Sequence, residues 1–361
     1  MKILTIIGAR PQFIKAAAVS RVIQSQQHLD EILVHTGQHF DANMSAVFFD
    51  ELNIPEPKYN LDISGGSHGE QTGKMLIKIE EVLLKENPDL VLVYGDTNST
   101  LAAALAAVKL HIPLAHVEAG LRSFNKKMPE EINRILTDHS SDILFTPTAA
   151  AIKNLQNEGI DNSKILNVGD VMLDATNYYG TKAEEHSSIL TDLKLTPKGY
   201  ILVTVHRAEN TDSLTRLKSI FDSLEKLSSD HNLVIPVHPR TMKSLKAIDF
   251  SRERSKIKFI SPVGYLDMMM LEKYSKTIIT DSGGVQKEAY FHKVPCVTLR
   301  DETEWTELVV NGWNFLANSD NLFESFSKAQ KIKFSDVDNI YGDGDAAFKI
   351  VDKLLQYPTS I

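Results

Sequence analysis

The sequence predicts an α/β protein built from two doubly wound parallel-sheet domains in series. Short apolar runs, which are typical of strands buried on both faces, alternate along the chain with segments of helical periodicity. This rhythm breaks once near the middle and then restarts, and 361 residues exceed what one ordinary hydrophobic core accommodates. We therefore expect two domains of similar length, each an open sheet with helices on both faces.

The first domain is expected to span residues 1–172. Apolar runs predict its strands at residues 2–7, 32–34, 90–94, 113–117 and 143–145. The helical pattern at residues 100–110 carries Leu101, Leu105 and Val108 at helical spacing. A last helical segment, within residues 345–361, is expected to pack back onto this domain.

The second domain is expected to span residues 173–344. Its strands are predicted at residues 200–205, 233–237, 257–260, 277–280 and 296–299. The two halves share this rhythm without sharing a sequence repeat. They therefore read as two Rossmann-like units.

Composition excludes several classes of protein. A net charge of −8 and a pI near 5.9 argue against a nucleic-acid surface but leave room for a small basic pocket. The single cysteine, Cys296, cannot form an internal disulfide and is expected in the core. No apolar run approaches the ~18 residues of a membrane span, so we expect a cytoplasmic enzyme without a membrane partner.

The residues that follow each strand are the candidates for a site, because ligands bind at the carboxyl ends of strands in open α/β sheets. The candidates are Arg10, Lys15, Asp96 and Glu118 in the first domain, and His206, Arg207 and His238 in the second. We expect two half-sites, one per domain, that face each other across a cleft.

Arg10 and Lys15 lie at the start of the first predicted helix, where cations oppose the helix dipole. Either this is a solvated helix start, or an anionic ligand compensates the charge. Neither domain has Gly-x-Gly-x-x-Gly after its first strand, and the chain has no P-loop motif, which disfavours a nicotinamide dehydrogenase and a P-loop enzyme. We expect no cofactor and no metal.

Acidic residues at strand ends and one histidine form a candidate catalytic set. Its members are Asp96, Glu118, Glu130 and His206. Asp96 could simply cap a helix, Glu130 or its neighbour Glu131 could serve the dipole of the helix after Pro129, and His206 alone could be structural. Together these groups suggest acid/base chemistry on a bound anion.

The sequence Ser282-Gly283-Gly284 follows a predicted strand and opens a helix. A tight turn would explain the two glycines, and so would a diphosphate on the first amides of the helix, with Ser282 as N-cap and hydroxyl donor. Glu288 lies about one and a half turns later, at ~3.6 residues per turn, where it could bridge the hydroxyls of a ribose. Two Rossmann-like domains with a nucleotide on the second describe the GT-B architecture.

Eight short motifs occur in an order and at spacings that are together highly specific. They are Gly8-Ala9-Arg10-Pro11 with Lys15, Gly37-Gln38-His39, Tyr94-Gly95-Asp96-Thr97, His116-Val117-Glu118-Ala119-Gly120-Leu121-Arg122, Pro129-Glu130-Glu131-Ile132-Asn133-Arg134, Val205-His206-Arg207, Val237-His238-Pro239, and Asp281-Ser282-Gly283-Gly284-Val285-Gln286-Lys287-Glu288. In these residues, and over essentially its whole length, the chain resembles the non-hydrolysing UDP-N-acetylglucosamine 2-epimerases of bacterial surface-polysaccharide and O-antigen synthesis.

The resemblance implies a GT-B homodimer that binds a UDP-activated acetamido sugar without a nicotinamide cofactor. It implies that Arg10, Ser282, Gly283 and Gly284 hold the diphosphate, that Glu288 holds the ribose, and that the segment from Val263 to Met268 holds the uracil. Lys15 and Arg207 are also expected to bind the UDP-sugar. The implied catalytic set is again Asp96, Glu118, Glu130 and His206. The implied reaction is anti elimination of UDP to a 2-acetamidoglucal, followed by syn re-addition.

Three departures from the family pattern bear on the substrate. Gln12 stands where glutamate is typical, Glu302-Thr303-Glu304-Trp305-Thr306 replaces Thr-Thr-Glu-Arg-Pro, and Phe40-Asp41 replaces polar residues after Gln-His. They resemble the branch that acts on UDP-2,3-diacetamido-2,3-dideoxyglucuronate. The amide of Gln12 could relieve repulsion with the carboxylate of that sugar. UDP-N-acetylglucosamine is the alternative substrate, and a GT-B glycosyltransferase, a hydrolysing epimerase and a UDP-sugar-binding regulator are the alternative functions.

Overall fold

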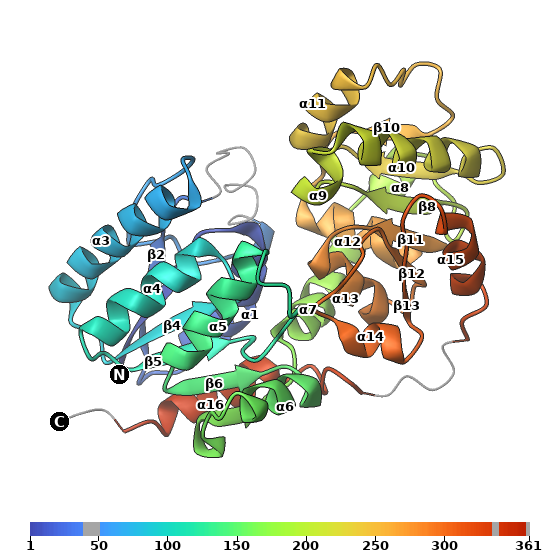
Figure 1. Ribbon diagram of the computed structural model, residues 1–361. Helices are drawn as coiled ribbons and strands as arrows, with labels where there is room; N and C mark the ends of the chain where they lie inside the picture. Colours follow the sequence, from blue (N-terminus) through green and yellow to red (C-terminus); the bar gives the residue numbers. More distant parts are fainter. Residues whose placement is uncertain (39–50, 334–338, 359–361) are drawn as a thin grey trace. The chain divides into compact units, whose positions relative to one another are not determined.

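The computed structural model describes residues 1–38, 51–333 and 339–358. The chain divides into two compact units (Figure 1). Unit 1 comprises Met1–Tyr178 and Asn339–Ile361, and unit 2 comprises Tyr179–Asp338. The helix α7 (Val171–His186) carries the chain from unit 1 into unit 2.

Unit 1 is an α/β layer structure around a parallel sheet in the order β3-β2-β1-β4-β5-β6-β7. The strands are β1 (Lys2–Ile7), β2 (Asp30–His35), β3 (Tyr59–Asn60), β4 (Leu90–Tyr94), β5 (Leu114–Val117), β6 (Ile143–Thr146) and β7 (Ile165–Asn167). The helices are α1 (Arg10–Gln24), α3 (His68–Glu86), α4 (Asn98–Lys109), α5 (Pro129–Ser140), α6 (Ala149–Asn157), the start of α7, and α16 (Ala346–Leu355), with a 3-10 turn at Asn162–Lys164. All five predicted strands are confirmed.

The C-terminal helix α16 belongs to unit 1 because its first turn is anchored on α7. The carboxylate of Asp174 accepts hydrogen bonds from the backbone N–H groups of Ala346, at 3.2 Å, and Ala347, at 2.8 Å. The carboxylate therefore caps a helix whose own N-cap residue, Asp345, makes no side-chain capping bond.

Unit 2 repeats the design with a parallel sheet in the order β10-β9-β8-β11-β12-β13. The strands are β8 (Ile201–Thr204), β9 (Leu233–Pro236), β10 (Lys258–Ile260), β11 (Thr277–Thr280), β12 (Cys296–Thr298) and β13 (Asn314–Leu316). The helices are α8 (Ile189–Asp192), α9 (Ala208–Thr211), α10 (Leu214–Leu227), α11 (Pro239–Ala247), α12 (Tyr265–Tyr274), α13 (Gly283–Phe291), α14 (Thr306–Val310) and α15 (Leu322–Ala329). The five strands predicted here are also confirmed.

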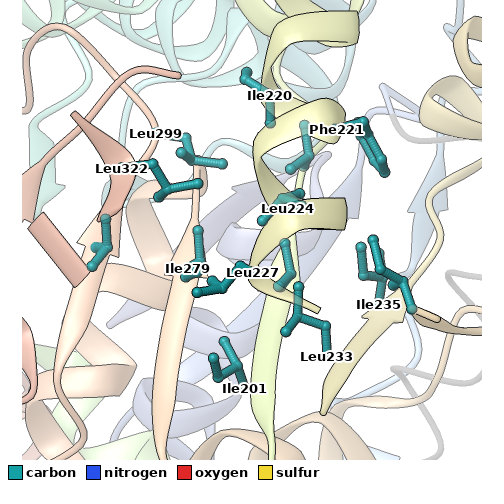
Figure 2. Close-up of a cluster of buried hydrophobic side chains, with 14 of the residues drawn as sticks. Ile201, Ile220, Phe221, Leu224, Leu227, Leu233, Ile235, Ile279, Leu299 and Leu322 are labelled. Carbon is teal, nitrogen blue, oxygen red and sulfur yellow. The ribbon is translucent and has the colours of Figure 1, made fainter. Parts of the chain in front are cut away.

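The core of unit 2 forms where α10 packs on its sheet. Figure 2 shows Phe221, Leu224 and Leu227 of this amphipathic helix over Ile201 and Ile279 of two neighbouring strands. These side chains are at most 4% exposed. On the other face of the sheet, Cys296 is buried as expected, and burial raises the pKa of its thiol to about 12, so it is a core residue and not a nucleophile.

Sheet order brings the candidate residues together within each unit. In unit 1, β4 lies between β1 and β5, so the turns that follow these three strands share one edge of the sheet. In unit 2, Thr204 at the end of β8 pairs with Thr280 at the end of β11, which places His206 beside Asp281. Among the described residues, no helix is both long and apolar enough to span a bilayer.

Candidate active site

The turn after β1 is tightly packed against its neighbours. A Cβ on Gly8 would lie 2.1 Å from Oγ1 of Thr36 and 2.2 Å from Oγ of Ser99, so only glycine fits there. Helix α1 then begins with Arg10 and Pro11, and its first turn contains no acidic residue. Arg10 is half-buried at this cationic helix start, as the sequence led us to expect.

Gln12 is a structural residue of this turn and cannot meet a substrate. Its side chain is 1% exposed, and its Oε1 accepts hydrogen bonds from the N–H groups of Gly8 and Ala9, at 2.8 and 3.0 Å. Its Nε2 donates to the carbonyl of Tyr94, at 2.9 Å, and to Oγ1 of Thr100, at 3.0 Å. The idea that this amide relieves repulsion with a sugar carboxylate is therefore wrong, because all of its polar atoms are used within unit 1.

Lys15 and Glu118 form a buried ion pair. Both side chains are less than 10% exposed. Glu118 has φ of +73°, a left-handed conformation that costs a non-glycine residue free energy and is concentrated at functional sites. A Cβ on Gly95 would stand 3.2 Å from Nζ of Lys15 and 3.3 Å from Oε2 of Glu118, so the glycine leaves room for this pair. Lys15 thus lies against a candidate catalytic acid.

Asp96 is joined to α5 through Arg134. One nitrogen of Arg134, Nη2, donates to Oδ2 of Asp96 at 2.7 Å, and the other, Nη1, donates to Oε2 of Glu131 at 2.7 Å. About a third of the Asp96 side chain is exposed, at 32%. The carboxylate is therefore oriented by the guanidinium while still accessible from solvent.

The two neighbouring acids of α5 have different roles. Glu131 is 1% exposed and accepts hydrogen bonds from the backbone N–H groups of Ser123, at 2.9 Å, and Phe124, at 2.8 Å. Burial opposes its ionisation, but these bonds and Arg134 outweigh burial and hold the pKa of Glu131 below its ordinary value. Glu130 is half-exposed in the first turn and accepts no hydrogen bond from a described residue. The free carboxylate is thus Glu130, the member of the predicted set.

In unit 2, His206 is oriented by Asp281. Nδ1 of His206 lies 3.3 Å from Oδ1 of Asp281, and the backbone N–H groups of His206 and Arg207 donate to the same carboxylate at 3.0 to 3.1 Å. Asp281 is fully buried, while His206 is 39% exposed. The ring of His238 lies 5.6 Å from that of His206. We did not assign Asp281 a role from the sequence, although its place at a strand end was a signal for one.

Helix α13 presents an open N-terminus, as expected. Ser282 occupies the N-cap position, but its side chain makes no capping bond, which corrects its expected role as a capping hydroxyl. The N–H groups of Gly283 and Gly284 have no acceptor in the described parts of the chain, and both residues are half-exposed. Free amides and the helix dipole together favour an anion here.

A carboxylate of the chain itself also approaches this helix terminus. Nη1 of Arg300 donates to Oε2 of Glu304 at 2.8 Å, and Nη2 of Arg207 lies 3.8 Å from Oε1 of Glu304. A Cβ on Gly283 would lie 2.4 Å from the same Oε1. The sequence did not indicate Glu304 and Arg300 as site residues. They follow β12, whereas Gly283 follows β11.

The expected ribose and uracil residues line the neighbouring part of unit 2. Glu288 is 5% exposed and lies near Tyr265, the first residue of α12, where burial and the charge of Glu288 raise the pKa of the Tyr265 hydroxyl. Val263 and Met268 are partly buried at the start of this helix and pack against the core cluster that contains Val285. Phe40 and Asp41, which carried a substrate argument, and His39 lie outside the described residues.

Comparisons with known proteins identify relatives of this chain. A family model for UDP-N-acetylglucosamine 2-epimerase matches residues 21–355. A protein of Methanococcus maripaludis described as a UDP-N-acetylglucosamine 2-epimerase homolog is 56% identical over 361 residues, which cover 98% of this chain and 99% of that protein. The UDP-2,3-diacetamido-2,3-dideoxy-D-glucuronate 2-epimerase of Pseudomonas aeruginosa is 54% identical over 359 residues, with 98% and 99% covered.

A solved structure shows the same fold. The UDP-GlcNAc 2-epimerase of Methanocaldococcus jannaschii, in complex with UDP-GlcNAc and UDP, aligns with a TM-score of 0.94 at 47% identity, over 99% of this chain and 100% of that one. This likeness confirms the predicted fold class, GT-B with two Rossmann-like parallel-sheet domains.

Proposed function

Because this chain belongs to the UDP-N-acetylglucosamine 2-epimerase family, we propose that it converts UDP-2,3-diacetamido-2,3-dideoxyglucuronate into its mannuronate epimer. The coarser activity follows from the family: the chain is an isomerase, a non-hydrolysing UDP-sugar 2-epimerase. The observation that carries the choice of substrate is the 54% identity with the Pseudomonas aeruginosa enzyme over almost the whole of both chains.

One of the three departures from the family pattern still supports this substrate. Trp305, which replaces the family's arginine, is 3% exposed, and Nζ of Lys287 lies 4.0 Å from the centre of its ring. A buried cation–π pair thus occupies the position where the family pattern has a basic residue that contacts the nucleotide side. Gln12 no longer contributes to the argument, since it is internal to unit 1.

The proposed mechanism is anti elimination of UDP across C1–C2 and syn re-addition to a 2-acetamidoglucal. The C2 proton has no neighbouring carbonyl to acidify it, so departure of UDP must lead. Arg10 and the open amides of Gly283 and Gly284 stabilise the charge that develops on the diphosphate. Glu288 binds the ribose, Val263 to Met268 the uracil, and Lys15, Arg207 and Ser282 complete the substrate contacts.

Acid/base groups must act on both faces of the sugar ring, since the proton leaves one face and returns to the other. We assign these roles to Asp96, Glu118, Glu130 and His206. The hydrogen bonds support the assignment: Arg134 orients Asp96, Lys15 pairs with Glu118, Asp281 directs Nδ1 of His206, and Glu130 faces solvent. Asp96, Glu118 and His206 each contact a charged neighbour, and Glu130 is half-exposed. None of the four side chains caps a helix in the part of the chain that the structure describes.

The decisive experiment uses proton NMR in heavy water with each UDP-sugar as the only substrate. An epimerase yields a second UDP-sugar that carries deuterium at C2, with a trace of UDP and glycal. A glycosyltransferase yields no second UDP-sugar. We expect kcat/KM to be at least about 10-fold higher for the diacetamido uronate than for UDP-N-acetylglucosamine. UDP-N-acetylglucosamine is the second candidate substrate, because the structure of the M. jannaschii enzyme contains UDP-GlcNAc. Equal turnover of the two UDP-sugars would support this second candidate.

Variants test the catalytic set. Glu118→Gln, Asp96→Asn and His206→Ala should each lower kcat by at least about 100-fold while the thermal transition is retained.

The adjacent acids Glu130 and Glu131 provide a matched pair of variants. Glu130→Gln should lower kcat and leave Tm unchanged, whereas Glu131→Gln should lower Tm, because only Glu131 anchors the backbone of Ser123 and Phe124. Wild-type rates for the Glu130 variant would remove it from the set.

We propose in addition that the enzyme is a homodimer and acts in surface-polysaccharide synthesis, including that of O-antigen. The support is the family resemblance. Sedimentation velocity of the purified protein at micromolar concentration tests the first part, and a single monomer boundary would contradict it.

A further inference from the structure

His116 has oxygen acceptors on both nitrogens of its ring. This residue of β5 is completely buried, with Nε2 at 2.7 Å from the carbonyl oxygen of Gly95 and Nδ1 at 2.7 Å from Oδ1 of Asp138. A carbonyl oxygen can only accept a hydrogen bond, so Nε2 carries a proton. The protonation of Nδ1 depends on the state of Asp138.

Two donors other than His116 hold Asp138 as a carboxylate. Besides His116, its Oδ2 accepts from the N–H of Gly120, at 3.1 Å, and from Nη1 of Arg122, at 2.7 Å. Burial opposes ionisation, but His116 and Arg122 outweigh it, so the pKa of Asp138 lies below its ordinary value. An ionised Asp138 can only accept, and Nδ1 of His116 must therefore also carry a proton.

A buried imidazolium needs counter-charge, and the surroundings of His116 supply it. Arg122 also binds Glu158 through Nε and Nη2, each at 2.7 Å, and Glu158 lies 3.0 Å from Nε2 of His139. Two buried cations, His116 and Arg122, thus face two carboxylates, Asp138 and Glu158. Such a network avoids the cost of an uncompensated charge in the interior.

The network fixes the two turns that carry candidate acids. Gly95, whose carbonyl His116 binds, precedes Asp96 and leaves the space in which Lys15 meets Glu118. Gly120, whose N–H Asp138 binds, follows Glu118 by two residues and has φ of +83°. Hydrogen bonds to charged groups are about twice as strong as those between neutral groups, so the charge of His116 stiffens this arrangement.

We propose that His116 is a positioning residue that donates hydrogen bonds from both ring nitrogens, to Gly95 and Asp138, and so locks the turns of Asp96 and Glu118 in place. The protonation follows from unit 1 alone. The effect on turnover rests on the proposed function, and the two parts are tested separately.

The protonation is tested by nitrogen NMR of the full chain labelled at histidine. One histidine should keep protons on both ring nitrogens at pH 8, where an ordinary histidine, with a pKa near ~6.5, is neutral. Its signal should be absent from His116→Gln. If the signal assigned to His116 shows one unprotonated nitrogen at pH 8, the proposal is overturned, whatever the protein catalyses.

The role of the charge is tested by Asp138→Asn, which keeps every hydrogen bond but removes the carboxylate. The amide oxygen can still accept from Gly120 and Arg122, and the amide nitrogen can donate to Nδ1 of a neutral His116. We expect loss of the doubly protonated signal and a fall in kcat on the order of 10-fold, with KM changed by less than about 2-fold.

His116→Gln should lower kcat on the order of 100-fold, because the bond to Gly95 is lost as well. His139→Gln is the control, since His139 is 46% exposed and binds only the outer acid of the network; its kcat should be that of the wild type. Unchanged kcat in both Asp138→Asn and His116→Gln would overturn the positioning role. If His116→Gln fails to fold, Asp138→Asn still decides it.

Discussion

The carboxylate of Glu304 lies against the α-carbon of Gly283, so closely that a Cβ at position 283 would stand 2.4 Å from Oε1. Arg300 holds that carboxylate from the other side, at 2.8 Å. At Gly284 the nearest such atom, Oε2 of Glu288, is 3.9 Å away. Glycine therefore occupies the two positions for different reasons. Gly283 makes room for the carboxylate of Glu304, and Gly284 leaves the helix terminus open.

Gly283→Ala and Gly284→Ala should therefore behave differently in the absence of ligand. The methyl group at position 283 must shift the carboxylate of Glu304, which is buried and bound by Arg300, and we expect a loss of about 2 kcal/mol in the free energy of unfolding. The methyl group at position 284 has ordinary van der Waals space, and we expect a change within about 0.5 kcal/mol. Urea denaturation of both variants checks this, and equal losses would contradict it.

Lys15→Met should destabilise the protein because it removes the cation that pairs with the buried carboxylate of Glu118. We expect a loss of about 3 kcal/mol, with partial recovery in the double variant Lys15→Met/Glu118→Gln. Lys74→Met is the control, since the Lys74–Glu70 pair is more than 50% exposed on both sides and should contribute less than about 0.5 kcal/mol. Additive effects of the two substitutions in the double variant would show that the buried pair is not coupled.

Gln12→Glu should change stability without changing substrate choice. The new carboxylate oxygen would face the carbonyl of Tyr94, which now accepts a hydrogen bond at 2.9 Å, and the expected loss is about 2 kcal/mol. The ratio of kcat/KM for the two UDP-sugars should stay within about 2-fold of the wild type. Gln24→Glu, at the exposed end of the same helix, controls for the added charge. A shift of the ratio by 10-fold or more would restore Gln12 as a specificity residue.

Asp174 should make unit 1 less stable as pH rises. Burial raises the pKa of this carboxyl to about 6 against an ordinary 3.8, even though Ala346 and Ala347 donate to it. The folded state favours the protonated form of Asp174. The stabilisation that results from this preference is complete below pH 4 and is lost as pH rises through 6. The arithmetic, about two pKa units at 1.36 kcal/mol each, gives about 3 kcal/mol.

Comparison with Asp174→Asn isolates this effect. Between pH 4 and 7, the free energy of unfolding of the wild type should fall by up to about 3 kcal/mol relative to the variant, as measured by urea denaturation. Asp352→Asn, exposed on α16, should follow the wild type. A constant difference between wild type and Asp174→Asn across this range would mean that Asp174 titrates normally.

The strands that the sequence missed are β3, β7 and β13, of two to three residues each. They lie at the edges of the two sheets and expose part of their side chains, so they lack the long apolar run that identifies a central strand. The central strands were predictable because both of their faces are buried, so their side chains form nearly continuous apolar runs. The candidate site residues were chosen by a related argument, since strand ends are where an α/β sheet leaves polar backbone open.

The sequence by itself determined the α/β class, the two-domain plan, the family and most of the candidate residues, because local periodicity and motif spacing are written along the chain. Only the tertiary structure decided what each polar side chain binds. Gln12 meets Tyr94 from 82 positions away, Lys15 meets Glu118 from 103, and Glu131 turns inward while Glu130 does not. Hydrogen bonds and ion pairs act over about 3 Å, and which distant groups come that close is set by how the strands are ordered in the sheet.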